Sequence, residues 1–531
     1  MSRILIFAAE HDAMNRHKLT NINKSIMDRL VYNLTVASFM ASTSLFAQNG
    51  FVQNGLEYEV LDSMQHTVAV AASLSGDMTK SYDHGNEIKV VQIKSVVRND
   101  GTDYRVIAVL DDAFADCRDI DRLVIDEGVE EIGTNAFARC KYLEEVSVPS
   151  SVVDIAPAAF SGCDRLSRIT VAEGNKVYDS RDNCNAVIES ESDKLIVGCC
   201  ATRIPGDVKA IGHSAFAGLT KLDDVELPEG LQAIESNAFS GCVRLKSIKL
   251  PESLRKIGES AFGWTALSEI AIPSGVTSIE LNPFVGCERL RSITVSAGNK
   301  VYDSRNNCNA IINSEKQRLV VGCPTTIVPK GVTRIAALAF AGQTGLTRMA
   351  IPKSVESIDV TAFSGCVNLM DLSVEKGNPV YDSRNGCNAI IETETQMLRI
   401  ACSGTEIPSD IVEIGEGAFA GMNTTAVLCI PHNIRVIGNS AFRGCGNLRQ
   451  LLFDTQNVMI GEGCFAECED LEAVQLPDNI RIIPKEMFKD CSKLAVVDIP
   501  FDCKIVEEDA FGNCACLSQL ELPKPMKDSG R

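Results

Sequence analysis

Three pairs of cysteines are the residues whose spacing best suits covalent chemistry. The two members of each pair are 15 positions apart, and each pair lies in one of three closely similar segments that contain VYDSR followed by an Asn-Cys or Gly-Cys step. Two apolar runs surround a polar centre in each segment, which predicts a β-hairpin with the cysteines opposed across it, within disulfide reach. Three disulfides are one interpretation, and buried cross-strand pairs of free thiols are the other. The pairs are Cys184 with Cys199, Cys308 with Cys323, and Cys387 with Cys402.

Other groups that could do chemistry are scattered. Ten further cysteines recur one per repeat, without the clustered CxxC spacing of a zinc site, and the six histidines are never paired at ligand spacing. The sequence has no nucleophile elbow, P-loop, dinucleotide-binding turn or zinc-protease signature. A Tyr-Asp-Ser-Arg run begins at Tyr178, Tyr302 and Tyr381, and we interpret its Asp as a turn cap rather than a calcium ligand. We therefore predict no enzyme activity, no catalytic residue, no cofactor and no metal site.

The elements that must position these residues repeat along the chain. Phenylalanine recurs mostly every 23 residues, from Phe114 and Phe137 to Phe488 and Phe511. Apolar residues at fixed distances after it, often followed by proline, predict a short strand with alternate side chains buried. Ile-Gly pairs before it predict either a tight turn with a positive φ or a close approach between neighbouring coils. The Ala-Phe-x-x-Cys spacing predicts a short helix or 3₁₀ turn.

A repeat of this length indicates a stacked solenoid, because one unit cannot bury its own apolar side. We predict an α/β repeat solenoid of 23-residue coils over residues 110–523, a small β-rich N-terminal cap at 50–109 and a tail at 524–531. Three Phe-to-Phe steps are 56 residues long, so the hairpin insertions fall near 172–204, 296–328 and 375–407. The hairpins either contribute to a binding face or cover strand edges. Within the cap, Asn99-Asp100-Gly101 predicts a hairpin turn.

The N-terminus and the net charge indicate the location and exclude some partners. Residues 1–47 have the layout of a secretory signal peptide, with Met14 or Met27 as alternative starts and an uncleaved anchor as the other interpretation. We expect an exported chain at the cell surface or in the extracellular space, or in the periplasm, with no membrane insertion after cleavage. The formal charge of −19 disfavours nucleic acid and anionic membranes as partners.

The repeat frame, as in IGTNAFARCKYLEEVSVPSSV and IGNSAFRGCGNLRQLLF, resembles that of the BspA-type leucine-rich-repeat proteins of bacterial surfaces. The resemblance covers about residues 105–523. It implies a right-handed leucine-rich-repeat superhelix and an exported adhesin whose partner is a host matrix protein or a bacterial surface protein. A structural surface or periplasmic scaffold that self-associates is the alternative function.

The outward strand positions differ between early and late copies of the repeat. Early copies are polar, as at Glu144, Glu145 and Ser147, whereas late copies are more apolar. A contiguous apolar strip on a solenoid face is a candidate contact site, and strand propensity without function is the alternative explanation. The predicted partner-binding residues, here called the C-terminal strip, are Ala426, Val427, Leu452, Ala473, Ala495 and Val496.

Overall fold

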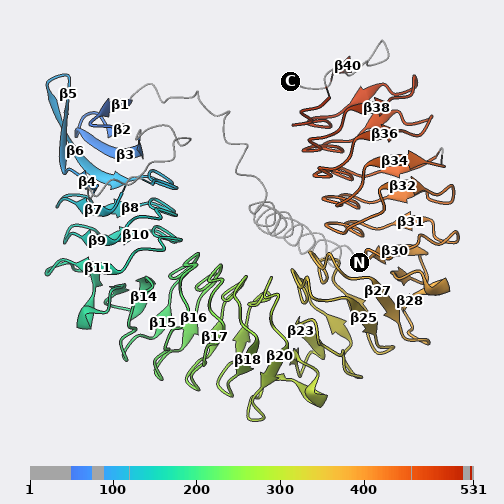
Figure 1. The fold of residues 1–531 in the computed structure, drawn as a ribbon, viewed down its shortest axis with the longest axis horizontal. Helices are drawn as coiled ribbons and strands as arrows, with labels where there is room; N and C mark the ends of the chain where they lie inside the picture. The colour runs from blue at the N-terminus through green and yellow to red at the C-terminus, as the bar shows by residue number, and fades with distance from the viewer. Residues whose placement is uncertain (1–49, 74–88, 119, 456, 518–526, 529–531) are drawn as a thin grey trace, which may run out of the picture.

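The computed structural model describes residues 50–73, 89–118, 120–455, 457–517 and 527–528. The predicted leader at residues 1–47 lies outside these ranges. Figure 1 shows a stack of coils that curves into an open horseshoe, with the N-terminal strands at the end of one arm and the last coils at the end of the other. The predicted solenoid is confirmed.

One strand of most coils joins a parallel ladder, here called the long-strand sheet. Its side chains alternate between buried and exposed, as the sequence pattern predicts, because successive residues of a strand face opposite sides. The ladder runs in four groups that are separated by the hairpins. These groups are β4 (Val90–Ile93), β7 (Arg122–Ile125), β9 (Glu145–Val148) and β11 (Arg168–Val171); β18 (Glu269–Ile272) and β20 (Ser292–Val295); β25 (Arg348–Ile351) and β27 (Asp371–Val374); and β32 (Val427–Ile430), β34 (Gln450–Phe453), β36 (Ala473–Gln475) and β38 (Val496–Asp498).

A second parallel ladder of two-residue strands, here called the short-strand sheet, is formed by the residues just before the Ile-Gly turns. Its buried member is nearly always isoleucine. The strands are β8 (Glu131–Ile132) and β10 (Asp154–Ile155); β15 (Ala210–Ile211), β16 (Ala233–Ile234), β17 (Lys256–Ile257) and β19 (Ser278–Ile279); β24 (Arg334–Ile335) and β26 (Ser357–Ile358); β31 (Glu413–Ile414), β33 (Val436–Ile437) and β35 (Met459–Ile460); and β37 (Ile482–Ile483), β39 (Ile505–Val506) and β40 (Lys527–Asp528). Through β40, part of the predicted tail continues this ladder.

The N-terminal cap is β-rich, as predicted. Its sheet joins the short-strand sheet because β6 pairs in parallel with β8. Asp100 and Gly101 form the expected two-residue turn between β5 and β6, and both have positive φ, as this type of hairpin turn requires. The cap strands are β1 (Gly50–Gln53), β2 (Leu56–Asp62), β3 (Thr67–Ser73), β5 (Val96–Asn99) and β6 (Thr102–Val109).

The three insertions are the predicted hairpins, with a third strand that the sequence prediction missed. The last strand of each hairpin pairs in parallel with the next coil, so the hairpin continues the short-strand sheet rather than projecting from it. The elements are β12 (Tyr178–Asp179), η2 (Arg181–Asn183), β13 (Val187–Glu189) and β14 (Lys194–Val197); β21 (Tyr302–Asp303), η3 (Arg305–Asn307), β22 (Ala310–Asn313) and β23 (Arg318–Gly322); and β28 (Tyr381–Asp382), η4 (Arg384–Gly386), β29 (Ile390–Glu392) and β30 (Met397–Ile400).

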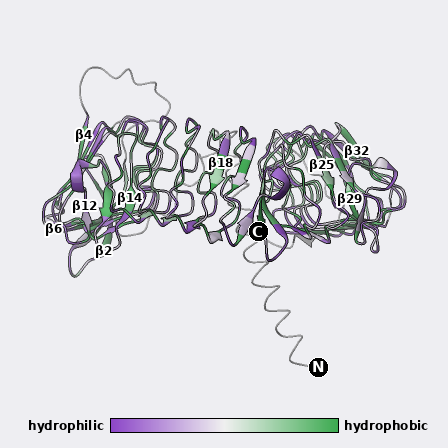
Figure 2. Cartoon of the chain, turned by 90° about the horizontal axis from the view of Figure 1, so that it is seen from below, coloured by the Kyte–Doolittle hydropathy of each residue, from purple (hydrophilic) through white to green (hydrophobic). Residues whose placement is uncertain are grey.

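The hairpins divide the core into four large clusters, here called the first to fourth segments, and Val285, Leu338 and Ala341 form a separate small cluster. The four segments cover residues 56–199, 184–323, 308–402 and 387–510 and overlap at the hairpins. Within each segment the phenylalanine rings stack between neighbouring coils, with centroids 5.0 Å apart for Phe216 and Phe239. Hydrophobic and hydrophilic residues alternate along the coils throughout the molecule (Figure 2).

Of the two roles predicted for the glycine of the Ile-Gly pairs, the structure shows a close approach between neighbouring coils. A Cβ on Gly438 would lie 2.5 Å from the backbone nitrogen of Glu416, and the φ of Gly438 is not positive. The α/β label, by contrast, is not confirmed. The only helices among the described residues are the three 3₁₀ segments in the hairpins, and the Ala-Phe-x-x-Cys runs are turns. The handedness of the superhelix stays a prediction.

Candidate protein-binding surface

The outward face of the long-strand sheet is charged in the first segment. Register pairing aligns Arg122, Glu145 and Arg168 on three neighbouring strands. The Glu145 carboxylate lies 2.9 Å from Arg122 and 3.5 Å from Arg168. Because the two arginines are about half exposed or more, these ion pairs contribute little to the stability of the fold, and their main effect is to make this surface polar.

The same face is largely apolar in the fourth segment. Register pairing aligns Val427, Gln450, Ala473 and Val496 on β32, β34, β36 and β38. Val427 is 51% exposed and Val496 is 60% exposed, although both are large aliphatic residues. Three residues of the predicted C-terminal strip therefore form one column, which Gln450 interrupts.

The other strip residues flank this column. Leu452 lies in a second outward column, opposite Cys429 on β32, and is half-buried. Ala426 and Ala495 are exposed and immediately precede β32 and β38. The strip is thus one surface of the fourth segment, and it includes Gln450 and Cys429, which the prediction left out.

A second apolar column on the short-strand sheet of the same segment was not predicted. It consists of Val436, Met459, Ile482 and Ile505, spaced by 23 residues, with Met459 69% exposed and Ile482 44% exposed. Register pairing joins Val436 to Met459, and Ile482 to Ile505. Most earlier coils have a charged or small residue there, such as Glu131. The sequence does contain a signal for this column, because the residue just before the recurring isoleucine is apolar in these four coils.

The six paired cysteines do not face one another in the core. In every hairpin the first cysteine packs into the segment that follows and the second into the segment that precedes. Cys184, for example, belongs to the second segment, whereas Cys199 belongs to the first. All six are free thiols in the structure, so the geometry favours the alternative interpretation. The disulfides stay a prediction.

The thiols are also protected chemically by their surroundings. Burial raises the pKa of Cys184, Cys199, Cys308, Cys387 and Cys402. The thiolate is the reactive form of cysteine, and a raised pKa reduces its fraction at neutral pH. Burial therefore favours the less reactive thiol form of these cysteines.

The cysteines that recur three residues after phenylalanine have a structural part. The Cys468 thiol donates to the carbonyl of Phe442 in the preceding coil at 3.2 Å, and the Cys242 thiol donates to Phe216 at 3.1 Å. Each of these carbonyls also accepts a backbone N–H in its own turn, as Phe442 does from Cys445 at 3.2 Å, so the thiol adds a second hydrogen bond that links neighbouring coils. Nothing in this ladder suggests ligand binding.

The Tyr-Asp-Ser-Arg run forms the predicted turn cap. Asp179 accepts a hydrogen bond from the backbone N–H of Arg181 at 3.0 Å, and its second oxygen lies 2.6 Å from the Arg181 guanidinium. Hydrogen bonds from Arg181 lower the pKa of Asp179 to about 2. The carboxylate is fully engaged within the hairpin, so it is not a metal ligand here. Among the described residues no group of three or more potential ligands is placed to hold a metal ion.

Within the described ranges, no helix has the length and apolar character needed to cross a bilayer.

Comparison with known proteins gives one clear family match. A model of the BspA type leucine rich repeat region matches residues 105–186, 199–311, 322–385 and 399–528, in six copies. A search of curated proteins returns no match.

Three solved structures are similar in fold. A leucine-rich cell surface protein of Faecalibacterium prausnitzii is 23% identical, with 90% of this chain and 100% of that chain covered and a TM-score of 0.37. A leucine-rich-repeat protein of Bacteroides ovatus is 21% identical, with 90% and 83% covered and a TM-score of 0.27. The pneumococcal vaccine antigen PcpA is 16% identical, with 87% and 94% covered and a TM-score of 0.34.

Proposed function

The chain belongs to the BspA-type leucine-rich-repeat family, and from this we propose that it is an exported adhesin that binds a protein partner at the cell surface. The observation that supports this proposal is the aligned column of Val427, Ala473 and Val496. Gln450 interrupts this column, but Cys429 and Leu452 extend the apolar surface beside it, and an exposed apolar strip on a solenoid face is a candidate contact site. The partner class is a host matrix protein or a bacterial surface protein.

The geometry of the surface suits a protein partner. Parallel strands about 4.8 Å apart present equivalent side chains in straight rows, which gives an extended and rather flat surface. Such a surface fits another protein surface better than a small molecule, which needs a concave pocket. The charged row of Arg122, Glu145 and Arg168 in the first segment supplies a polar region that would orient a partner spanning both arms.

Self-association into a structural scaffold is the alternative function. It uses the same apolar strip but needs no second kind of protein. Equilibrium molecular mass distinguishes the two functions, because a scaffold gives concentration-dependent assembly of the purified chain, whereas an adhesin stays monomeric until its partner is added.

The experiment begins with proteolysis of intact cells, which tests surface location. The purified chain then serves as bait for candidate matrix and bacterial surface proteins. A Val427→Glu, Val496→Glu double variant is expected to lose partner binding by at least about tenfold, because two charges would be buried in the contact. Ala271→Glu and Ala350→Glu are matched controls, because both alanines are exposed on the long-strand sheet of other segments. Unchanged binding and unchanged molecular mass of the double variant would remove the proposal.

A further inference from the structure

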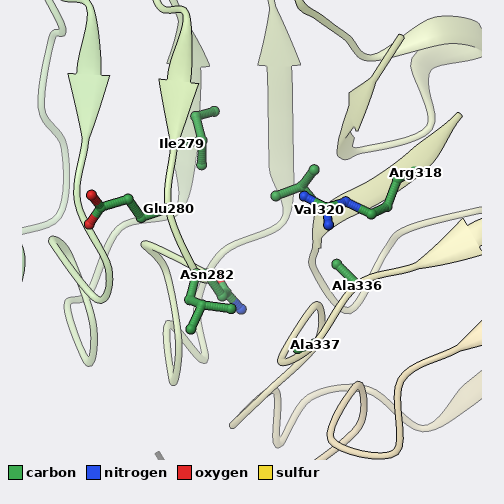
Figure 3. A pocket seen from close by; sticks show the side chains of 8 residues that line it. Ile279, Glu280, Asn282, Arg318, Val320, Ala336 and Ala337 are labelled. Atoms are coloured by element: carbon green, nitrogen blue, oxygen red, sulfur yellow. The ribbon is translucent and has the colours of Figure 1, made fainter. Parts of the chain in front are cut away.

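A cavity of about 260 Å³ lies where the second segment meets the third, beside the second hairpin (Figure 3). Ile279 and Leu281 line one wall, and Val320, Ala336 and Ala337 line the other. The volume is close to the lower end of the range for small-molecule sites. The lining is mostly aliphatic, so the space favours a small apolar group.

One cation enters this cavity without a partner. The Arg318 side chain extends from β23 into the space between the two walls (Figure 3). Its Nε is buried and has no hydrogen-bond acceptor, and it forms no ion pair with any residue in the described ranges. A buried guanidinium donor without an acceptor is costly, and an anion in the cavity would supply the acceptor.

The only carboxylate in the lining is already engaged elsewhere. Glu280 lies 2.7 Å from the Lys256 ammonium, and it accepts hydrogen bonds from the backbone N–H of Glu259 at 3.1 Å and from the Ser236 hydroxyl at 3.2 Å. Glu280 is therefore neutralised by Lys256. The uncompensated charge in the cavity is that of Arg318, so the cavity selects an anion.

The other two junctions differ from the middle one at the residue that follows the short-strand isoleucine. Gly212 and Gly415 occupy the position of Ala336, and a Cβ on either would lie 2.9 Å or 3.1 Å from a carbonyl oxygen of the hairpin strand. The Ala336 methyl instead lines the cavity. The backbones are equally close at the middle junction, since the Ala336 N–H donates to the Leu319 carbonyl at 2.9 Å, as the Gly415 N–H does to the Leu398 carbonyl at 2.9 Å. The middle junction therefore differs by the added methyl group and not by wider backbone spacing.

The charged groups also differ between the junctions. Lys194, which is equivalent to Arg318 in the first hairpin, lies 3.6 Å from Glu235, and the third hairpin has the uncharged Met397 there. Ion pairs to the following coil, such as Arg384 with Asp410 at 3.0 Å, have no counterpart at the middle hairpin, where Gly331 replaces the aspartate. The middle junction combines the cavity with the unpaired Nε of Arg318, and the third junction also holds an arginine, Arg399, whose buried Nε has no acceptor.

We propose that this cavity binds an aliphatic carboxylate. The carboxylate would accept hydrogen bonds from Arg318, and the short aliphatic part would contact Ile279, Leu281 and Val320. Either a free short-chain carboxylic acid or the C-terminal aliphatic residue of a polypeptide presents this chemistry. The site is separate from the C-terminal strip on the fourth segment, so a negative result for one proposal does not contradict the other.

Two probes distinguish the sources of the carboxylate. Hexanoate represents the free acid, and an acetylated tripeptide ending in valine represents a polypeptide terminus, with its amidated form as the uncharged control. Each is titrated into the full chain while the thermal unfolding midpoint and the heat of binding are measured. We expect a saturable rise in the midpoint with hexanoate or with the free-acid peptide, and none with the amide.

Variants then assign the binding to the cavity. Arg318→Met copies the residue of the third hairpin, so it should fold, and it should weaken binding about tenfold or more because it removes the charge-assisted hydrogen bonds. Ala337→Leu keeps the cation but fills the space and should also abolish binding. Arg334→Gln, at the exposed register neighbour of Arg318, should bind as the unmodified chain does. Absence of a saturable shift with both probes, retained binding in Arg318→Met, or equal loss in Arg334→Gln would each overturn the proposal.

Discussion

The phenol oxygen of Tyr302 accepts a hydrogen bond from the backbone N–H of Ile279 at 3.0 Å. Ile279 lies in β19, the last strand of its group of the short-strand sheet, and Tyr302 comes from the following hairpin. The same contact joins Tyr178 to Ile155 at 3.1 Å. A tyrosine hydroxyl therefore ends the ladder where a neighbouring strand would otherwise supply the acceptor.

Replacement of Tyr302 by phenylalanine should destabilise this end of the sheet. The buried Ile279 N–H would lose its acceptor, at a cost of about 1–3 kcal/mol. Amide exchange at Ile279 should accelerate accordingly, and hydrogen exchange with mass spectrometry measures it. Tyr104→Phe is the control, since the Tyr104 hydroxyl has no hydrogen bond among the described residues. Equal protection of Ile279 in both variants would contradict the assigned part of Tyr302.

A methyl group at Gly438 should also lower stability. Its Cβ would meet the backbone of Glu416 at 2.5 Å, and two backbones cannot separate without loosening the stack. Overpacking of this kind costs about 1–3 kcal/mol. Gly206→Ala is the matched control, because a Cβ there meets nothing within 4 Å and its φ is not positive. Urea unfolding midpoints compare the two, and a Gly438→Ala midpoint equal to that of the control would show that the coils tolerate separation.

The cysteine pairs are open to a direct mass measurement. We expect intact mass to be the same with and without reductant, and all six thiols to be alkylated once the unreduced chain is unfolded, because the members of each pair pack into different segments. Alkylation of the native chain should be slow, since burial raises the pKa of thiols such as Cys184 and Cys402. Loss of two hydrogens per pair in the unreduced mass would instead establish the disulfides.

Acid should weaken the first hairpin through Asp179. Its pKa of about 2 lies below the ordinary value of 3.8, so the native state binds this proton less readily than the unfolded chain. The contribution to stability is therefore complete above about pH 4 and is lost as pH falls towards 2, and it amounts to at most about 2 kcal/mol. The Asp179→Asn variant should lack this part of the pH dependence of unfolding.

A suitable comparison for that titration is Asp224→Asn, because Asp224 is exposed and forms no ion pair with a described residue. This variant should retain the pH profile of the unmodified chain between pH 4 and pH 2. Identical profiles for Asp179→Asn and Asp224→Asn would mean that the Asp179–Arg181 pair contributes nothing to the acid dependence.

The two apolar columns of the fourth segment can be separated by charge substitution. Met459→Glu and Ile482→Glu affect the short-strand sheet only, and because both side chains are largely or partly exposed, stability should change by about 0.5 kcal/mol or less. If the partner contacts the C-terminal strip alone, these variants should bind as the unmodified chain does. Light scattering and titration of the partner measure the effect. A loss of binding in these variants would move the contact to the short-strand sheet.

The repeat frame made the coils, the hairpins and the cap turn predictable, because each depends on residues that are close in sequence. Asp100-Gly101, for example, encodes its turn locally. The Phe and Cys of Ala-Phe-x-x-Cys were placed on one face of a helical turn, but the runs are non-helical turns, and the Cys thiol donates to a carbonyl of the neighbouring coil.

What the sequence could not predict depends on contacts between distant coils. Tyr178 lies in a strand only because β13 pairs with that strand. The Tyr178 hydroxyl can accept its hydrogen bond only because the backbone N–H of Ile155 in the preceding coil lies within reach. The unpaired Nε of Arg318 depends on which groups the neighbouring coils bring near it, and spacing alone does not reveal this. The apolar column on the short-strand sheet could have been predicted from the sequence, since its four members recur every 23 residues.

Each hairpin begins a new core and closes the one before it, which has a consequence for how the gene can change in length. The second and third hairpins share the VYDSR run and the spacing of their two cysteines, and Tyr302 and Tyr381 are equivalent within them. Recombination between these two copies would remove or duplicate the stretch from one tyrosine to the other and would leave a hairpin that keeps an equivalent tyrosine. Related chains can therefore differ in the number of coils while each core segment keeps the same kind of end. The length of the horseshoe can vary between them.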